Sequence, residues 1–210
     1  MMKFAAAALA TFAQAQKVSV ELYYESQCPG CRQMITTSFA EAYQAEGFLE
    51  MADITLVPYG NAHGIDSCQH GVEECEYNMV ESCALNLITD GLAQFNFINC
   101  IEQNDTSRKT SGDYDGNIDL CTAASGTDAY NSAIKTCYKG TEGQEYETVM
   151  MNETDALSPS HSYVPWVVGQ GVHSDEVQNE VTSSLLSYVC SNYKGSNKSP
   201  DCPNATNFLQ

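Results

Sequence analysis

The segment that decides the fold runs from Lys17 to Gly47 and reads KVSVELYYESQCPGCRQMITTSFAEAYQAEG. Apolar residues alternate with polar ones from Val18 to Tyr24, which predicts a strand with one face in the core. A Cys-x-x-Cys pair follows, and apolar residues then recur at helical spacing until Gly47, a residue type that often ends a helix. The next run, ADITLVPYG from Ala52, has the character of a second strand. We therefore expect a βαβ unit with both cysteines at the start of its helix.

The rest of the chain divides into a helical middle and a second strand-forming segment. Residues 64–157 show little strand character, and we expect a helical insertion there, with helices near 71–90, 92–103, 118–138 and 142–151. The polar, Gly- and Asp-rich run 104–117 is expected to be a loop. Strand character returns in YVPWVV from Tyr163, and the pattern from Glu176 to Tyr193 predicts one continuous helix.

Composition places the chain on the secretory route. Residues 1–15 combine the basic Lys3, an apolar Ala-rich stretch and the small-x-small pattern Ala13-Gln14-Ala15, which is typical of a cleaved signal peptide. We therefore expect one folded domain over residues 16–203, with residues 204–210 as a tail. Ten cysteines indicate an oxidising compartment, and so do four Asn-x-Ser/Thr glycosylation sequons, at Asn104, Asn152, Asn197 and Asn204.

Charge and hydropathy limit the partners of the chain. Nine basic and 27 acidic residues give a net charge of −18, and such a surface repels nucleic acid phosphates and anionic lipid headgroups. Beyond the predicted signal peptide, no continuous apolar run is long enough to span a bilayer. We therefore expect no nucleic acid partner and no membrane insertion. Acidic pH would neutralise part of this surface, so the composition is compatible with an acidic compartment.

Cys28 and Cys31 are the candidate catalytic residues. The start of a helix presents unpaired backbone N–H groups and the positive end of the helix dipole, and both stabilise a thiolate. Cys28 is nearer to the helix terminus, so we assign it as the nucleophile, and Cys31 as the residue that resolves the mixed disulfide. A zinc ribbon would need a second Cys-x-x-Cys pair, which the sequence lacks. A purely structural disulfide between the two would close too small a loop to stabilise the fold much.

Val164 and Pro165 form the predicted substrate-side loop of the site. Thioredoxin-like folds place a cis-proline opposite the Cys-x-x-Cys pair, ahead of a strand, and an X-Pro bond adopts the cis form at modest cost. Val164-Pro165 stands at the corresponding point in the order of elements, and His161 just upstream is a weaker candidate for the same region. The predicted fold class is therefore α/β, a thioredoxin-like fold with a central helical insertion, stapled by disulfides.

Residues 68–83 read CQHGVEECEYNMVESC, and this segment resembles the signature of the gamma-interferon-inducible lysosomal thiol reductase family. The matching positions are Cys68-Gln69-His70-Gly71, Glu74-Cys75, Asn78 and Cys83. The segments TDALSPSHSYVPWV and LLSYVCSNYKG, with DCP near the end, also resemble the family, and the Cys-x-x-Cys pair lies upstream at the expected place. The resemblance runs from about residue 18 to 203 and is weakest between about 101 and 135.

The resemblance implies reduction of protein disulfides in an acidic endolysosomal compartment. It implies disulfide-containing protein substrates and an external thiol reductant, either a small molecule or a protein, with no cofactor beyond the Cys28–Cys31 disulfide itself. An ordinary thiol is protonated at low pH, so such an enzyme needs a strongly lowered pKa at Cys28. The secretory signal leaves a lysosomal and an extracellular location open.

Two other functions stay open on the residues alone. The same fold could act as a disulfide oxidase or isomerase, because the direction of exchange depends on the reduction potential of the pair and not on the motif. The alternative from another class is a secreted, disulfide-stapled binding protein whose Cys-x-x-Cys pair is inert.

The signature segment has a structural and a catalytic interpretation. A helix from Cys68 would place Val72, Cys75, Met79 and Cys83 on one apolar face, suited to docking onto the core by disulfides. We favour this role over catalysis by His70 as a base for Cys28, and over a metal site built from His70 and the neighbouring cysteines. We expect no metal and eight structural cysteines, with roughly one hundred possible pairings: Cys68, Cys75, Cys83, Cys100, Cys121, Cys137, Cys190 and Cys202.

Overall fold

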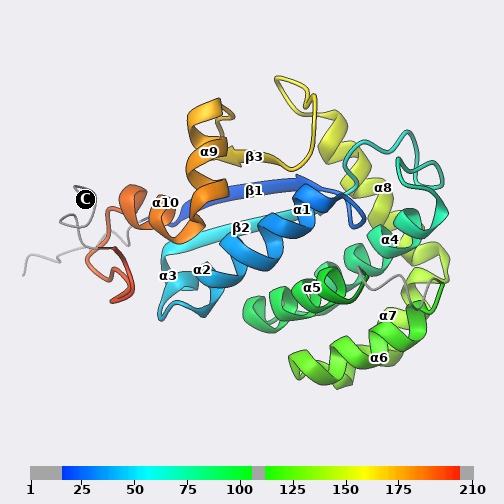
Figure 1. Ribbon diagram of the computed structural model, residues 1–210. Coiled ribbons are helices and arrows are strands. Elements are labelled where there is room, and N and C mark those ends of the chain that lie inside the picture. Colours follow the sequence, from blue (N-terminus) through cyan, green and yellow to red (C-terminus); the bar gives the residue numbers. More distant parts are fainter. Residues whose placement is uncertain (1–15, 106–111, 204–210) are drawn as a thin grey trace, which may run out of the picture.

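A three-stranded sheet forms the centre of the computed structural model, which describes residues 16–105 and 112–203. Its strand order is β2–β1–β3, with bounds β1 (Val18–Tyr24), β2 (Ala52–Pro58) and β3 (Trp166–Gly169). β1 pairs in parallel with β2 and antiparallel with β3, as Figure 1 shows. The predicted signal peptide and the 204–210 tail, with Asn204, lie outside the described residues.

The alternation along β1 gives the sheet two different faces. Val20, Leu22 and Tyr24 are buried in the main core, where they pack with the helices between β1 and β2. Tyr23 points to the other face and joins a second, smaller cluster with Trp166 of β3. The period of two read from the sequence is therefore the physical cause of the two layers.

Three short helical elements and a π-helical segment connect β1 to β2. They are α1 (Pro29–Met34), the π segment (Ile35–Phe39), α2 (Ala40–Gln44) and α3 (Phe48–Met51). Gly47 has a φ of 72°, and this left-handed conformation turns the chain between α2 and α3. This is the predicted βαβ unit, and it delivers the Cys-x-x-Cys pair to the end of β1.

The helical insertion lies beside the end of the sheet where β1 leads into α1 (Figure 1). Its elements are α4 (Val72–Leu87), α5 (Gly91–Asp105), α6 (Tyr114–Ser125), the 3-10 helix (Asp128–Tyr130), α7 (Asn131–Tyr138) and α8 (Thr141–Asp155). The prediction of one helix over 118–138 is wrong, because Gly126 adopts a φ of 72° and ends α6. The predicted loop 104–117 is also too long, since α6 begins at Tyr114 and α5 extends to Asp105.

The C-terminal helix is divided in two, which the sequence pattern did not predict. α9 (Asp175–Ser183) and α10 (Leu185–Asn192) are separated at Ser184, whose backbone is extended. Ser38 from the π segment donates a hydrogen bond to the Val181 carbonyl at 2.6 Å and accepts one from the Leu185 N–H at 2.8 Å. A side chain distant in sequence thus satisfies the backbone groups that the interruption leaves open.

Four disulfides join the eight predicted structural cysteines in pairs. Cys83–Cys137 ties α4 to α7, and Cys100–Cys121 ties α5 to α6, so two of the four join different helices of the insertion. Cys190–Cys202 fixes the segment after α10, while Cys68–Cys75 closes a short local loop at the start of α4. Across residues 16–105 and 112–203, no helix combines the length and the hydropathy that a membrane crossing requires.

Candidate active site

Cys28 is the N-cap residue of α1, directly after β1. Its backbone is extended, Pro29 takes the first helical position, and its Sγ accepts a hydrogen bond from the Cys31 N–H at 3.3 Å. The pKa of Cys28 is lowered to about 6, first by a hydrogen bond from the Cys31 thiol, against the opposing effect of burial, and then by the N–H groups of Cys31 and Gly30 and the charge of His70. Cys28 therefore carries a thiolate far more readily than an ordinary cysteine.

Cys31 has the opposite character. Its side chain is fully buried, whereas 8% of Cys28 is exposed. Burial raises the pKa of Cys31 far above the ordinary thiol value, and its hydrogen bond to Cys28 acts in the same direction. Both thiols are free in this structure, so it represents the reduced pair. Cys28 is therefore partly exposed and readily ionised, whereas Cys31 is buried and stays protonated.

The Val164–Pro165 loop lies against this pair from the other side. The peptide bond between the two residues is cis, and the Val164 carbonyl oxygen is 3.8 Å from Cys28 Sγ. A methyl group added at Gly30 would stand 3.3 Å from Pro165 Cδ, so the small residue between the cysteines allows this close approach. The structure thus brings together residues that are 136 positions apart in the sequence.

Glu25 is a residue of the site that the sequence analysis did not single out. It follows β1, its carbonyl accepts the Cys28 N–H at 3.2 Å, and only 1% of it is exposed. Burial raises the pKa of Glu25 to about 7, partly offset by the Asn61 N–H, with Glu74 and Cys28 raising it further and His70 lowering it. The signal available in the sequence was a lone acidic residue at the end of a strand, three positions before the nucleophile.

His70 reaches this carboxylate from the signature segment. The imidazole Nδ1 is 3.4 Å from Glu25 Oε1 and is hydrogen-bonded to Glu74 Oε2. The backbone N–H of His70 donates to Glu74 Oε1 at 3.1 Å. One imidazole nitrogen and one oxygen from each carboxyl group, the atoms that could bind a metal ion, lie within 4.8 Å of one another. Direct contact between the imidazole and a carboxyl group leaves no room for an ion between them, so we interpret the group as a hydrogen-bonded cluster of one imidazole and two carboxyl groups. The alternative metal site with the cysteines is wrong, since Cys68, Cys75 and Cys83 are all in disulfides.

Two further carboxylates are buried on the Cys31 side of the pair. Glu102 of α5 is within 3.8 Å of the Arg32 guanidinium and acts electrostatically on Cys31. Glu81 of α4 accepts a 2.5 Å hydrogen bond from the buried Tyr24 hydroxyl. Both glutamates belong to the insertion, which therefore contributes Glu102 to the electrostatics of Cys31.

The remaining residues singled out from the sequence differ in how far they are buried. Val72 does not join the buried face of α4 but is 69% exposed, whereas Cys75 and Cys83 are buried as predicted. His161 is half-buried in the loop before Tyr163. Among the sequons, Asn152 and Asn197 are exposed, and Asn104 is half-buried, with its amide donating to the Cys100 carbonyl at 2.8 Å.

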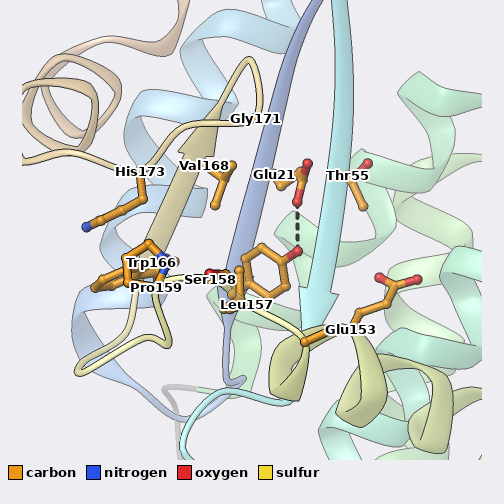
Figure 2. Close-up of a pocket in the computed structure, with 12 residues that line it drawn as sticks. Glu21, Thr55, Glu153, Leu157, Ser158, Pro159, Trp166, Val168, Gly171 and His173 are labelled. Atoms are coloured by element: carbon orange, nitrogen blue, oxygen red, sulfur yellow. Dashed lines mark hydrogen bonds between the residues drawn. The ribbon is translucent and has the colours of Figure 1, made fainter.

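A cavity of about 430 Å³ lies on the other face of the sheet, away from the thiols. Figure 2 shows Trp166 and His173 on one side of it and Glu21 and Thr55 on the other. The rings of Trp166 and His173 are stacked, and the Tyr23 hydroxyl donates to Glu21 at 2.7 Å. Neither cysteine of the pair lines this cavity, so we treat it as separate from the thiol chemistry.

The region that carries the thiol pair and the signature segment matches a known family. The family model for gamma interferon inducible lysosomal thiol reductase (GILT) matches residues 19–125. The chain belongs to this family. A GILT from Carassius auratus is 35% identical over 188 residues, covering 86% of this chain and 70% of the relative. A gamma-interferon-responsive lysosomal thiol protein from Arabidopsis thaliana is 35% identical over 195 residues, covering 90% and 77%.

Solved structures with this arrangement support the fold assignment for the GILT chain. MdbA, a thiol–disulfide oxidoreductase from Corynebacterium diphtheriae, aligns with a TM-score of 0.57 at 13% identity, covering 83% of this chain and 86% of that one. DsbA from Xylella fastidiosa aligns with a TM-score of 0.52 at 14% identity, covering 86% and 87%. The predicted thioredoxin-like fold and the predicted family are confirmed, and the chain is a thiol–disulfide oxidoreductase.

Proposed function

We propose that this protein reduces disulfides in polypeptide substrates within an acidic compartment of the secretory pathway, with Cys28 as nucleophile and Cys31 as resolving residue. The Cys28 thiolate attacks one sulfur of the substrate disulfide, a mixed disulfide forms, and the other substrate sulfur leaves and takes up a proton. Cys31 then loses its proton and attacks Cys28, which releases the second substrate thiol and leaves a Cys28–Cys31 disulfide. An external thiol, oxidised in the exchange, restores the reduced pair.

The observation that carries this proposal is the contrast between the two thiols. With a pKa of about 6, roughly a tenth of the Cys28 side chains are thiolates at pH 5, whereas an ordinary cysteine would be almost entirely protonated there. The value is nearer to that of thioredoxin, about 7, than to that of the strong oxidant DsbA, about 3.5. Since a very low pKa stabilises the reduced form and favours oxidation of the partner, the moderate value favours a reductase.

Buried carboxyl groups support the acidic setting. Burial raises the pKa of Glu147 to about 8, despite a hydrogen bond from Ser82, and that of Glu25 to about 7. Each group therefore keeps its proton in the folded state over a range in which the unfolded chain loses it. As pH rises from about 4.5 to the folded pKa values, the unfolded state gains stability relative to the folded one. Both groups thus favour the fold at acidic pH.

Access to Cys28 supports a polypeptide substrate. The Val164 carbonyl lies beside Cys28 Sγ, and the neighbouring Tyr163 is 41% exposed. A substrate chain that approaches Cys28 would therefore meet an exposed aromatic ring next to the cis-proline loop. A relative from Mus musculus, 35% identical over 192 residues, carries the name gamma-interferon-inducible lysosomal thiol reductase, which agrees with the proposed lysosomal location.

The proposal is tested by reduction of insulin disulfides at about pH 4.5 and about pH 7, with dithiothreitol or cysteine as the external thiol. Purified parent protein should accelerate reduction at the acidic pH, and Cys28→Ser should equal the uncatalysed rate. Equal rates for parent and variant at both pH values would exclude the reductase and would favour an inert pair in a binding protein.

The second candidate is a disulfide oxidase on the same fold, because the direction of exchange is set by the reduction potential of the Cys28–Cys31 pair and not by the pKa of Cys28 alone. The two are separated by equilibrating the Cys28–Cys31 pair with glutathione buffers and trapping the species by alkylation. A potential near that of thioredoxin, about −270 mV, supports the reductase, and one near that of DsbA, about −120 mV, supports the oxidase.

A further inference from the structure

The cluster of Glu25, His70 and Glu74 combines groups from three parts of the fold around one imidazole. Glu25 comes from the end of β1, Glu74 from the first turn of α4, and His70 from the connection between them. Glu74 is fully buried, and Glu25 is 1% exposed, while the imidazole is one-third exposed. Burial keeps water away from both carboxyl groups, so the imidazole is a polar partner that the two share.

The imidazole is held in place by covalent and backbone constraints. The Cys68–Cys75 disulfide encloses His70 and Glu74 in one small loop. The His70 N–H bonds to Glu74, and the side chain of the adjacent Gln69 accepts a 2.6 Å hydrogen bond from Asn61, whose own N–H binds Glu25 at 2.9 Å. Gly60, with a φ of 60°, passes so close that a methyl group there would collide with the Glu25 carboxylate. Each member of the cluster is therefore oriented by another.

The cluster acts on the nucleophile through charge. A positive charge on His70 stabilises the Cys28 thiolate, and a negative charge on Glu25 destabilises it, since the two anions repel each other. Other groups that face the pair are Cys31 in α1, the Val164 carbonyl, and, towards Cys31, Glu102 with Arg32. Glu25 is the group beside Cys28 whose charge changes near neutral pH, because its pKa is raised to about 7, and Glu74 faces His70 through two hydrogen bonds.

We propose that His70 is a positioning residue that increases the ionised fraction of Cys28 in acidic solution, and that Glu25 is the opposing charge that weakens this effect as the pH rises. The proposal rests on the function proposed above and deepens it, because it names the neighbours that control the ionisation of the nucleophile in acid. In acid, Glu25 is neutral and places no negative charge beside Cys28. Near neutral pH, Glu25 becomes an anion with a pKa of about 7, and its charge then repels the Cys28 thiolate and opposes the effect of His70.

The test is a titration of the Cys28 thiolate in the reduced protein, followed by ultraviolet thiolate absorbance and by the rate of iodoacetamide alkylation from about pH 4 to about pH 9. Because the pKa of Cys31 is raised far above this range, only Cys28 contributes. His70→Gln should move the midpoint upwards and reduce the thiolate at pH 5 by about threefold, a modest effect because the imidazole is partly exposed. Glu25→Gln should move the midpoint downwards and sharpen the curve towards that of a single group.

Two further variants separate charge from structure. His63→Gln removes an imidazole from the same connection and should leave the midpoint where the parent has it. His70→Lys restores a positive charge without the imidazole, and should return the midpoint towards the parent value. A midpoint in His70→Gln equal to that of the parent, or a His70→Lys curve that matches His70→Gln, overturns the proposal. If His70→Gln does not fold, an unmoved midpoint and shape in Glu25→Gln overturns it instead.

The titration needs neither a substrate nor turnover, so its result is independent of insulin reduction. A shifted midpoint in a protein that fails to reduce insulin would support the role of His70 and exclude the reductase. An unmoved midpoint in a protein that reduces insulin would support the reductase and exclude the role of His70.

Discussion

Two short cysteine segments in this protein, 28–31 and 68–75, have opposite roles. Cys28 and Cys31 are free thiols at the start of α1, and their pKa values are moved in opposite directions. Cys68 and Cys75 form a disulfide at the start of α4 and do not titrate. Both segments lie at a helix N-terminus in the same folded unit. The helix terminus by itself therefore does not make a cysteine reactive.

The difference comes from what each segment contacts. Cys28 receives hydrogen bonds from Cys31 and Gly30, which stabilise its thiolate, and its Sγ lies 3.8 Å from the Val164 carbonyl oxygen. Cys68 and Cys75 enclose His70 and Glu74, whose side chains point towards Glu25 beside Cys28. In the proposed cycle, the first segment provides the reacting sulfur, and the second holds His70 and Glu74 in place near it.

The largest expected effect is the loss of the nucleophile. Cys28→Ser should reduce the catalysed rate of insulin reduction by at least about a thousandfold, because a serine hydroxyl is not ionised in this pH range. Its melting temperature should stay close to that of the reduced parent. A Cys28→Ser protein that retains appreciable activity would assign the chemistry to another cysteine.

Loss of the resolving cysteine should block the cycle one step later. Cys31→Ser keeps the thiolate at Cys28 but cannot release a mixed disulfide from within, so substrate should remain covalently attached to Cys28. Non-reducing gel electrophoresis and mass spectrometry would detect this adduct, with Cys28→Ser as the matched control. Full multiple turnover by Cys31→Ser without accumulation of the adduct would contradict the assigned roles.

The structural disulfides should differ from the reactive pair by acting on stability. Removing Cys83–Cys137, which spans 54 residues, should lower the free energy of unfolding by about 4 kcal/mol on the chain-entropy model. Removing Cys68–Cys75, which spans 7 residues, should cost only about 2 kcal/mol. Urea unfolding of the two double alanine variants measures both. A larger loss for the shorter loop would mean that its native contacts outweigh its effect on chain entropy.

The smallest expected effect is a change in the pH dependence of stability. The pKa of Glu147 is about 8 in the folded protein, so the carboxyl favours the fold below its ordinary pKa and loses this contribution as pH rises towards 8. Glu147→Gln should flatten the decline in melting temperature between about pH 5 and pH 8, with Glu145→Gln on the exposed side of α8 as control. Parallel curves for all three proteins would argue against a buried proton on Glu147.

The sequence predicted the parts of the site that depend on local order. The strand, the Cys-x-x-Cys pair and the helix are consecutive, and their spacing alone placed Cys28 at a helix N-terminus. The same reasoning failed at Ser184. The interruption of the helix there is stabilised by hydrogen bonds to Ser38, which is 146 positions earlier. It also missed Glu25, since nothing local distinguishes a strand-end glutamate that will be buried from one that will be solvated.

The sequence by itself determined the family, and it predicted the secretory character and the two reacting cysteines, because short-range periodicity, residue type and motif spacing carry that information. Only the tertiary structure decided which of the eight other cysteines pair, and that His70 and Glu25 come together beside Cys28. The physical reason is that burial and electrostatic interaction depend on distance in space. Positions 25, 28, 70 and 164 become neighbours only when the strand, the insertion and the proline loop have packed.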